Sequence, residues 1–211
     1  MDRVAGSFGF PFRSGAARAW LVGIPLLVLF PLGLVALLGY AVAVTRSAIA
    51  DPEAGPPSWR PLSGLIRDGL LLAGVLIVLT SPFAALAALL APRLTGLLVG
   101  LVHDPSLRGA TAWVIGAAIA GLPWGILLLV LMPPATARFA ITGSPRDLLD
   151  IPGALATVCR RFPAWNLAVV AIVTAWAIGL CGLGLVLVGV VPGVLYAILV
   201  SAHATASLAD A

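Results

Sequence analysis

The sequence contains no lysine and few charged residues of either sign. Twelve arginines and eight acidic residues make up 9% of the 211 residues, against 61% that are hydrophobic. Soluble domains carry about 25% charged residues and about 45–50% apolar ones. A loosely packed soluble core does not account for a deficit of this size. The composition therefore excludes a soluble domain and predicts an integral membrane protein.

Cysteine and recognisable catalytic motifs are also scarce. The two cysteines, Cys159 and Cys181, are too few for a disulfide framework and lack metal-ligand spacing. The arginines lie between apolar runs and are not interleaved with aromatic residues as on a nucleic-acid-binding surface. Phosphate-binding loops and the HExxH and GxSxG motifs are missing. We therefore expect no nucleic-acid partner, no metal site and no enzyme activity.

Long apolar runs dominate the remainder. A helix needs about 20 apolar residues to cross a hydrocarbon core about 30 Å thick. Five segments meet this length and are predicted to span the membrane, at 19–44, 69–91, 110–132, 164–182 and 184–206. The first run is longer than a signal-peptide core of about 7–15 residues, so we expect a permanent span. The predicted fold is an all-α, polytopic transmembrane bundle forming one membrane domain over residues 1–211, with four or six spans as the alternatives.

The segment 58–68 is amphipathic and is predicted to lie in the membrane interface. On a helical wheel Trp59 and the leucines face one side, whereas Arg60 and Arg67 face the other. Ser58 is suited to cap this short helix. We expect Trp59 at the headgroup boundary and the two arginines in contact with lipid headgroups or a partner protein.

The segment 144–162 shows a second amphipathic pattern. One predicted face is apolar and the other carries Asp150, Thr157 and Arg161; the apolar face holds Leu148, Ile151, Leu155, Val158 and Phe162. Pro152 indicates that the stable helix begins near Asp150. The residues Arg160, Arg161 and Trp165 then mark the return to the bilayer and are predicted to contact the membrane surface or a partner.

Orientation does not follow from the arginine count with five spans. Placing both amphipathic linkers on one side gives seven arginines there and five on the other. This difference is too small for the positive-inside rule to decide. The use of arginine without lysine is typical of GC-rich coding sequences and favours a bacterial protein of the cytoplasmic (inner) membrane.

Several short motifs resemble a bacterial and archaeal family of polytopic membrane proteins of unknown function. The pattern is FPF…W…GY…PxW…DGL in the first half, followed by RFA…G and a C-terminal span of small residues. The matching residues are Phe10-Pro11, Trp20, Gly23, Gly39-Tyr40, Arg46, Pro57, Trp59, Asp68-Gly69-Leu70, Arg138-Phe139-Ala140, Gly143 and Ser201-Ala202-His203-Ala204. In that family the linker before DGL is often acidic, whereas here Arg60 and Arg67 make it basic. The resemblance implies a fold and a membrane location and no activity.

Two histidines are candidates for chemistry. His203 lies among small residues of the last span and could ligate a haem or chlorophyll-type pigment, although a hydrogen bond to a neighbouring helix is favoured. His103 with Asp104 could form a base and its orienting carboxylate, but the pair also fits an ordinary surface turn. No cofactor is predicted from either position.

The leading hypothesis is a non-enzymatic membrane protein that acts by association. It would serve as a scaffold or accessory subunit of a larger, possibly energy-transducing, complex of other membrane subunits, in contact with membrane lipids. The lack of charge at mid-depth in any predicted span supports it, because ion-coupled transport usually requires such charge. The alternative is a small transporter or lipid-handling permease, which the proline-interrupted spans and the repeated span–linker–span pattern favour.

Overall fold

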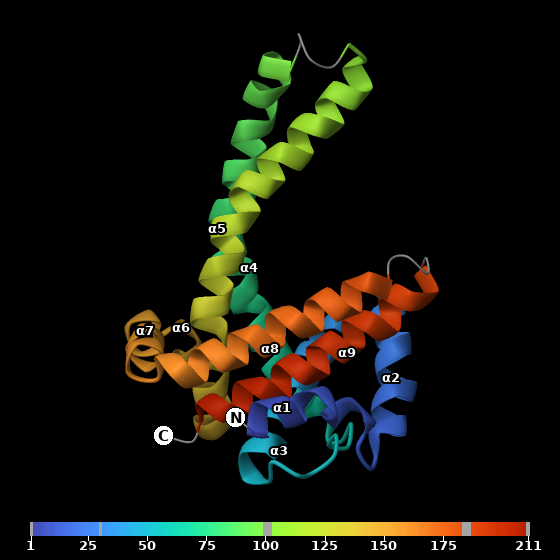
Figure 1. The fold of residues 1–211 in the computed structure, drawn as a ribbon, viewed down its shortest axis with the longest axis vertical. Coiled ribbons are helices and arrows are strands. Elements are labelled where there is room, and N and C mark those ends of the chain that lie inside the picture. The colour runs from blue at the N-terminus through green and yellow to red at the C-terminus, as the bar shows by residue number, and fades with distance from the viewer. Residues whose placement is uncertain (1, 30, 99–102, 183–186, 210–211) are drawn as a thin grey trace. The chain divides into compact units, whose positions relative to one another are not determined.

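A computed structural model of the protein describes residues 2–29, 31–98, 103–182 and 187–209. Within these residues the chain is helical and no strand is found. Helices α3, α4, α5, α8 and α9 are long and apolar enough to cross a membrane, which confirms the predicted all-α bundle. The elements, labelled in Figure 1, are α1 (Asp2–Ala5), η1 (Gly6–Phe8), η2 (Phe10–Phe12), α2 (Ala16–Val28), α3 (Leu32–Ala50), α4 (Leu62–Leu97), α5 (Pro105–Thr142), α6 (Arg146–Leu149), α7 (Ile151–Arg160), α8 (Phe162–Cys181), α9 (Leu187–Thr205) and η5 (Ala206–Leu208).

Internal contacts group the chain into two compact units. The first unit comprises Met1–Ala73 and Val130–Ala211, and the second comprises Gly74–Leu129. The first unit contains every element outside α4 and α5, together with the start of α4 and the end of α5. Nearly all of the buried polar residues belong to the first unit, so the candidate site is described there.

The predicted single span at 19–44 is wrong, because the chain turns back within it. Helix α2 ends at Val28 and α3 begins at Leu32, and the two helices pack against each other. The segments before α2 and after α3 also meet, since Arg13 donates a hydrogen bond to the backbone oxygen of Pro52. With 13 residues, α2 is about 20 Å long and is too short to cross a bilayer.

Two residue types explain this turn. Pro31 stands immediately before α3 and has no amide hydrogen to continue a helix from α2. Gly33 has no side chain, and a Cβ at this position would overlap the backbone oxygen of Leu26. The backbones therefore come into contact at the tip of the α2–α3 hairpin, where a larger residue would force them apart.

Glycine also closes the other helix pairs of the first unit. Helices α8 and α9 form an antiparallel pair, visible in Figure 1, in which Gly179 contacts the backbone of Gly193 and Gly182 that of Gly189. The predicted boundary between the spans 164–182 and 184–206 lies outside the described residues, which stop at 182 and resume at 187. Bilayers provide no hydrophobic drive for helix association, so backbone contact between small residues supplies the packing energy.

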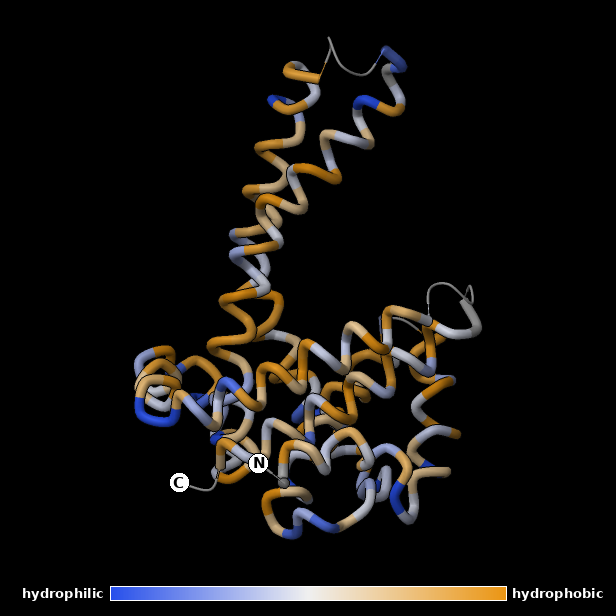
Figure 2. Tube along the Cα trace, viewed as in Figure 1, coloured by the Kyte–Doolittle hydropathy of each residue, from blue (hydrophilic) through white to orange (hydrophobic). Residues whose placement is uncertain are grey.

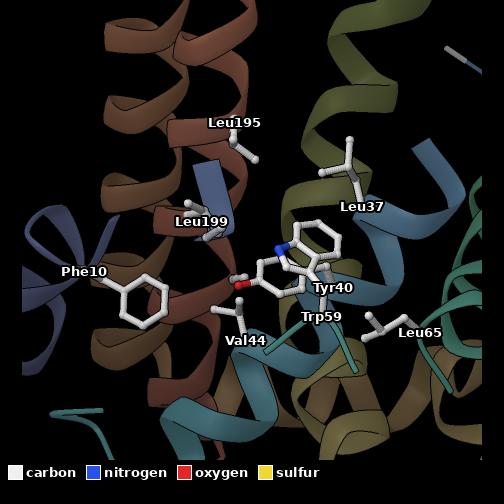
Figure 3. Packing of buried hydrophobic residues seen from close by; sticks show 10 residues of the cluster. Phe10, Leu37, Tyr40, Val44, Trp59, Leu65, Leu195 and Leu199 are labelled. Atoms are coloured by element: carbon white, nitrogen blue, oxygen red, sulfur yellow. The ribbon is translucent and has the colours of Figure 1, made fainter. Parts of the chain in front are cut away.

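The core of the first unit is centred on Tyr40 and Trp59. Their rings stack with centroids 3.8 Å apart and an interplanar angle of 6°. Figure 3 shows this pair between Leu37 on α3 and the leucines of α9, Leu195 and Leu199. The tyrosine hydroxyl donates to the backbone oxygen of Pro57 at 2.8 Å, so the linker is bonded to α3 as well as packed against it.

The second unit is a pair of long helices with apolar residues on most of its outer surface. The indole Nε1 of Trp124 on α5 donates to the hydroxyl of Thr80 on α4 at 3.1 Å. Gly116 lies in contact with the backbone oxygen of Ala87 across the pair. Figure 2 shows hydrophobic residues along both helices, and helices that are apolar on all sides are typical of a lipid or protein environment without water.

The crossing of α3 and α4 provides a test of the packing. A Cβ at Gly39 would overlap the backbone oxygen of Leu65, and one at Gly69 would overlap that of Val35. We expect Gly39→Ala to lower the free energy of unfolding by about 2 kcal/mol, because the two backbones must separate. The measurement is reversible unfolding in mixed detergent micelles.

Gly121→Ala is the matched control, since a Cβ at Gly121 meets nothing within 4 Å. Its free energy of unfolding should stay within about 0.5 kcal/mol of the wild type. Equal effects of the two substitutions would show that backbone contact does not hold α3 to α4.

Candidate functional site

The polar residues of the first unit gather at one end of its helices. We call this region the polar end; it comprises residues 2–15, the linker 51–61, the segment 143–161, residues 206–209 and the adjoining helix turns. Hydrogen bonds join its separate parts, from Arg13 to Pro52, from Arg46 to Ala140 and between Ser7 and His203. Both predicted interfacial segments therefore lie at the same end of the unit as the N-terminal segment.

The N-terminal segment is attached to α9 through His203. This side chain is 4% exposed, and its ring lies 4.6 Å from that of Phe10. Its Nε2 faces the backbone oxygen of Pro52 at 3.2 Å, and in the neutral ring it therefore carries the proton. Nδ1 then accepts from the hydroxyl of Ser7 at 2.8 Å. Arg13 donates to the same Pro52 oxygen, so one carbonyl holds the N-terminal segment and α9 together.

This arrangement bears on the hypothesis that His203 ligates a pigment. Both ring nitrogens lie within hydrogen-bonding distance of protein groups, and a metal ligand needs one of them free. The contacts match the favoured interpretation, a histidine bonded to neighbouring segments. Among the described residues, no group of three or more His, Cys, Asp or Glu side chains could hold a metal ion.

A second cluster joins α3, α4 and α5. The carboxylate of Asp68 is buried, with 6% of its side chain exposed, and receives Arg46 on one oxygen at 3.2 Å and Arg67 on the other at 3.3 Å. The Nε of Arg46 donates to the backbone oxygen of Ala140 at 3.0 Å. We call these side chains the Arg46–Asp68–Arg67 cluster. Only Arg67 was predicted as a site residue, because nothing in the local sequence pairs Arg46 with a carboxylate 22 positions later.

A third ion pair fastens the segment 143–161 to α5. Arg138 donates to the carboxylate of Asp150 at 2.7 Å and also to its backbone oxygen at 3.0 Å. Asp150 caps α7, accepting from the amide of Gly153 at 3.0 Å, so the predicted helix start near Asp150 is where the structure places it. The cap hydrogen bond and then the Arg138 bond stabilise the charged form and lower the pKa of Asp150.

The predicted interfacial helix at 58–68 is wrong in two respects. Residues 62–68 form the first turns of α4, and Ser58 bonds the backbone oxygen of Arg60 without capping a helix. Trp59 is 8% exposed and stacks on Tyr40, so it is not at the surface, and its Nε1 has no hydrogen-bond partner among the described residues. A helical wheel shows which residues share a face but not that the aromatic residue has a partner on another helix. Arg60 is exposed, and its predicted contact with headgroups or a partner stays a prediction.

The second predicted interfacial segment forms helices, but its apolar residues divide between two directions. Leu148 and Val158 are buried against the unit, whereas Ile151, Leu155 and Phe162 are exposed. The inward face of α7 is completed by Ala154, a small residue absent from the predicted apolar face. The single apolar face predicted for 144–162 is therefore wrong, because only part of its apolar residues pack against the unit.

The arginines of this segment differ from its acidic residues in their contacts. Asp150 pairs with Arg138, and Asp147 accepts from the hydroxyl of Thr142. Arg160 is exposed and, among the described residues, bonds only the backbone oxygen of Ala156 on its own helix, and Arg161 is half-buried. Trp165 is half-buried, with its ring 5.6 Å from that of Phe162. Cys159 is exposed on the same outer side of α7.

The His103–Asp104 candidate of the second unit has a structural explanation. Asp104 accepts hydrogen bonds from the hydroxyl and amide of Ser106 and from the amide of Leu107, at 2.6, 2.8 and 3.4 Å. These bonds lower the pKa of Asp104 and cap the start of α5. The backbone oxygen of His103 accepts from Arg108 at 3.1 Å. The carboxylate is therefore engaged as a helix cap.

The comparison with known families agrees with this fold of apolar helices. Residues 22–201 match the family described as "Protein of unknown function (DUF4013)". The chain belongs to the DUF4013 family. No curated protein and no solved structure matches it. The match covers α3 to α8 and most of α9, including the Arg46–Asp68–Arg67 cluster, and the five apolar helices indicate a membrane protein.

The lowered pKa of Asp150 predicts an acid dependence of stability. Because the pKa is lower in the folded than in the unfolded chain, the stabilisation is complete above the ordinary aspartate pKa of about 4. It is lost as pH falls from there through the lowered value. Thermal unfolding between pH 6 and pH 2 should therefore show a smaller acid-induced loss for Asp150→Asn than for the wild type.

Glu53→Gln is the control for this experiment. Glu53 is 88% exposed and lies 3.8 Å from Arg13, a separation at which an exposed ion pair contributes little. Its acid profile should match the wild type. A profile for Asp150→Asn that is as steep as the wild type's would show that the Asp150 interactions with Arg138 and Gly153 do not stabilise the fold.

Proposed function

We propose that this protein is a non-enzymatic membrane protein that acts by association, as a scaffold or accessory subunit of a larger membrane complex. The observation that carries the proposal is the uncovered apolar surface of the second unit. Large hydrophobic side chains are exposed on α4 and α5, including Ile77, Val78, Leu89, Trp113, Val114, Leu122 and Ile126. Lipid alone can cover such residues, so a further feature is needed to support a protein partner.

That feature is the pair Gly121 and Gly125 on α5. Nothing lies within 4 Å of a Cβ built at either position, whereas a Cβ at Gly39 or Gly179 of the first unit would overlap neighbouring backbone. A GxxxG pair on an open helix face lets another helix approach closely enough for backbone contact. We therefore infer that the partner contributes a transmembrane helix to this face of α5. The sequence contains three such pairs, which is no enrichment over chance, so the open surroundings of Gly121 and Gly125 support the proposal and the motif by itself does not.

The contacts of the polar end support a non-enzymatic role. His203, Asp68, Arg138 and Asp150 each bond another segment of the same chain. Their hydrogen bonds hold the fold together in the way that structural polar networks do. Catalysis requires such groups to face a substrate, and these four side chains instead bond other parts of the protein.

A small transporter or lipid-handling permease is the second candidate. The interruption between α2 and α3 favours it, because broken helices form the substrate sites of many transporters. The residues that flank the break, Val28, Leu29 and Leu32, are apolar and exposed. Transporter sites of this kind place polar backbone or side chains toward the substrate, so the apolar flanks favour association over transport.

We further propose that the polar end faces the cytoplasm of a bacterial cell, with the helices in the inner membrane. Because the α2–α3 hairpin returns the chain to its starting side, the N-terminal segment and both linkers share one end. Ten of the twelve arginines belong to this end: Arg3, Arg13, Arg18, Arg46, Arg60, Arg67, Arg138, Arg146, Arg160 and Arg161. Arginine-rich short segments remain in the cytoplasm during insertion.

The two native cysteines allow the orientation to be tested. Cys159 lies at the polar end and Cys181 is the last residue of α8, whose 20 residues span about 30 Å. A membrane-impermeant maleimide applied to spheroplasts should label Cys159→Ala, which retains Cys181. Cys181→Ala, which retains Cys159, should be labelled only after permeabilisation. The reverse pattern would contradict a cytoplasmic polar end.

Association is tested by purification in mild detergent with identification of co-purifying proteins. We expect a membrane protein partner with the wild type and its loss with Gly121→Leu/Gly125→Leu, because leucine side chains would keep the partner helix away. Gly109→Leu is the matched control on the same helix, since its Cβ also meets nothing within 4 Å. A monomer without any co-purifying protein, or equal retention by all three proteins, would sink the proposal.

A further inference from the structure

The Arg46–Asp68–Arg67 cluster carries one more positive charge than negative. Two guanidinium groups share a single carboxylate, which receives one arginine on each oxygen. The side chain of Asp68 is 6% exposed, whereas those of Arg46 and Arg67 are 47% and 69% exposed. The negative charge is therefore buried and the surplus positive charge faces outward.

The two arginines keep hydrogen-bond donors that the protein does not use. A guanidinium has five N–H groups. Arg46 bonds through Nε and one Nη2 hydrogen, and Arg67 through the same two nitrogens. Both Nη1 groups have no hydrogen-bond partner among the described residues. Asp68 binds both guanidinium groups and so holds them beside each other, and both arginine side chains are partly exposed.

The surroundings of the cluster indicate the kind of anion. On α4, Leu62, Ile66 and Leu70 are exposed and lie on the helix turns before, beside and after Arg67. The apolar helix then continues for more than six further turns. A ligand of this surface would place an anionic group on the arginines and hydrocarbon along the exposed leucine and isoleucine side chains. Phospholipids combine these two features.

We propose that Arg46 and Arg67 bind the phosphate of an anionic phospholipid and that Asp68 is the positioning residue of this site. Paired N–H donors of arginine match the oxygen atoms of a phosphate, and the interaction strengthens near the low dielectric of the acyl chains. Zwitterionic phospholipids bring their own cation and leave the surplus charge of the cluster uncompensated. An anionic headgroup neutralises it. This site is independent of the partner helix proposed for α5.

Other arginines of the polar end differ from this pair. Arg13 and Arg138 donate mainly to backbone oxygens and to a carboxylate within the protein. Arg60 is exposed and forms no ion pair with the described residues, so it represents the general attraction of a basic surface for anionic lipid. Arg67→Gln therefore removes one positive charge from the site, and Arg60→Gln removes one positive charge from the general surface.

The experiment measures lipid retention by the full-length protein with native mass spectrometry. The protein is exchanged into detergent containing equal amounts of phosphatidylglycerol and phosphatidylcholine. We expect preferential retention of phosphatidylglycerol by the wild type and about a tenfold reduction in Arg67→Gln, because a charge-assisted hydrogen bond to the phosphate is lost. The reduction in Arg60→Gln should be much smaller, because only the general attraction of the surface is weakened. Equal reductions in both variants, or no preference in the wild type, would overturn the proposal.

Two further measurements distinguish lipid phosphate from free phosphate and keep the test decisive if the variant does not fold. Excess inorganic phosphate should leave the retained lipid in place, because it cannot use the apolar residues of α4; displacement would assign the site to free phosphate and overturn the lipid assignment. Arg67→Gln retains the Arg46–Asp68 ion pair and is expected to fold. Should it fail to fold, the wild-type protein decides: phosphatidylglycerol must raise its melting temperature more than phosphatidylcholine does, and an equal shift would contradict the site.

Discussion

Backbone contact at glycine is the constraint on which the rest of this structure depends. In water, burial of apolar side chains would drive the helices together, but lipid tails satisfy those side chains equally well. Helices in a bilayer are therefore stabilised against each other by close backbone packing that lipid chains cannot provide. Gly39 with Gly69, Gly179 with Gly193, and Gly33 with Leu26 of α2 bring backbones within contact distance. These contacts set the directions of the helices that the polar side chains then join.

The polar end shows how a chain with few charges distributes them. The acidic side chains Asp68 and Asp150 are each paired with arginine. Arginine is in excess, so the remaining cations face outward where lipid phosphates lie. The hydrogen bonds of this end connect segments far apart in the chain, and each of them fixes the position of a helix end. Stability and membrane-surface character therefore come from the same group of residues.

The sequence predicted the class of fold and several local features, for identifiable reasons. Four of the five long apolar runs correspond to the membrane-length helices α4, α5, α8 and α9, and Pro152 places a helix start at Asp150. The α2–α3 turn was not predictable, because a proline within an apolar run can produce either a kinked helix or a reversal of the chain. Which of the two forms here depends on the contact between Leu26 and Gly33. The burial of Trp59 depends on stacking with Tyr40, and the partner of Asp68 lies on another helix. Such pairings between elements leave no periodic pattern in the sequence.

The bond between Ser7 and His203 joins positions 196 residues apart. Proteins are synthesised from the N-terminus at about 5–20 residues per second, so the first segment exists for some time before its partner helix does. During that interval Arg13 can bond the Pro52 carbonyl, but the N-terminal segment lacks its contacts with α9. The joining of the first and last segments therefore completes the assembly of the first unit, and only a chain that contains the end of α9 can reach that state.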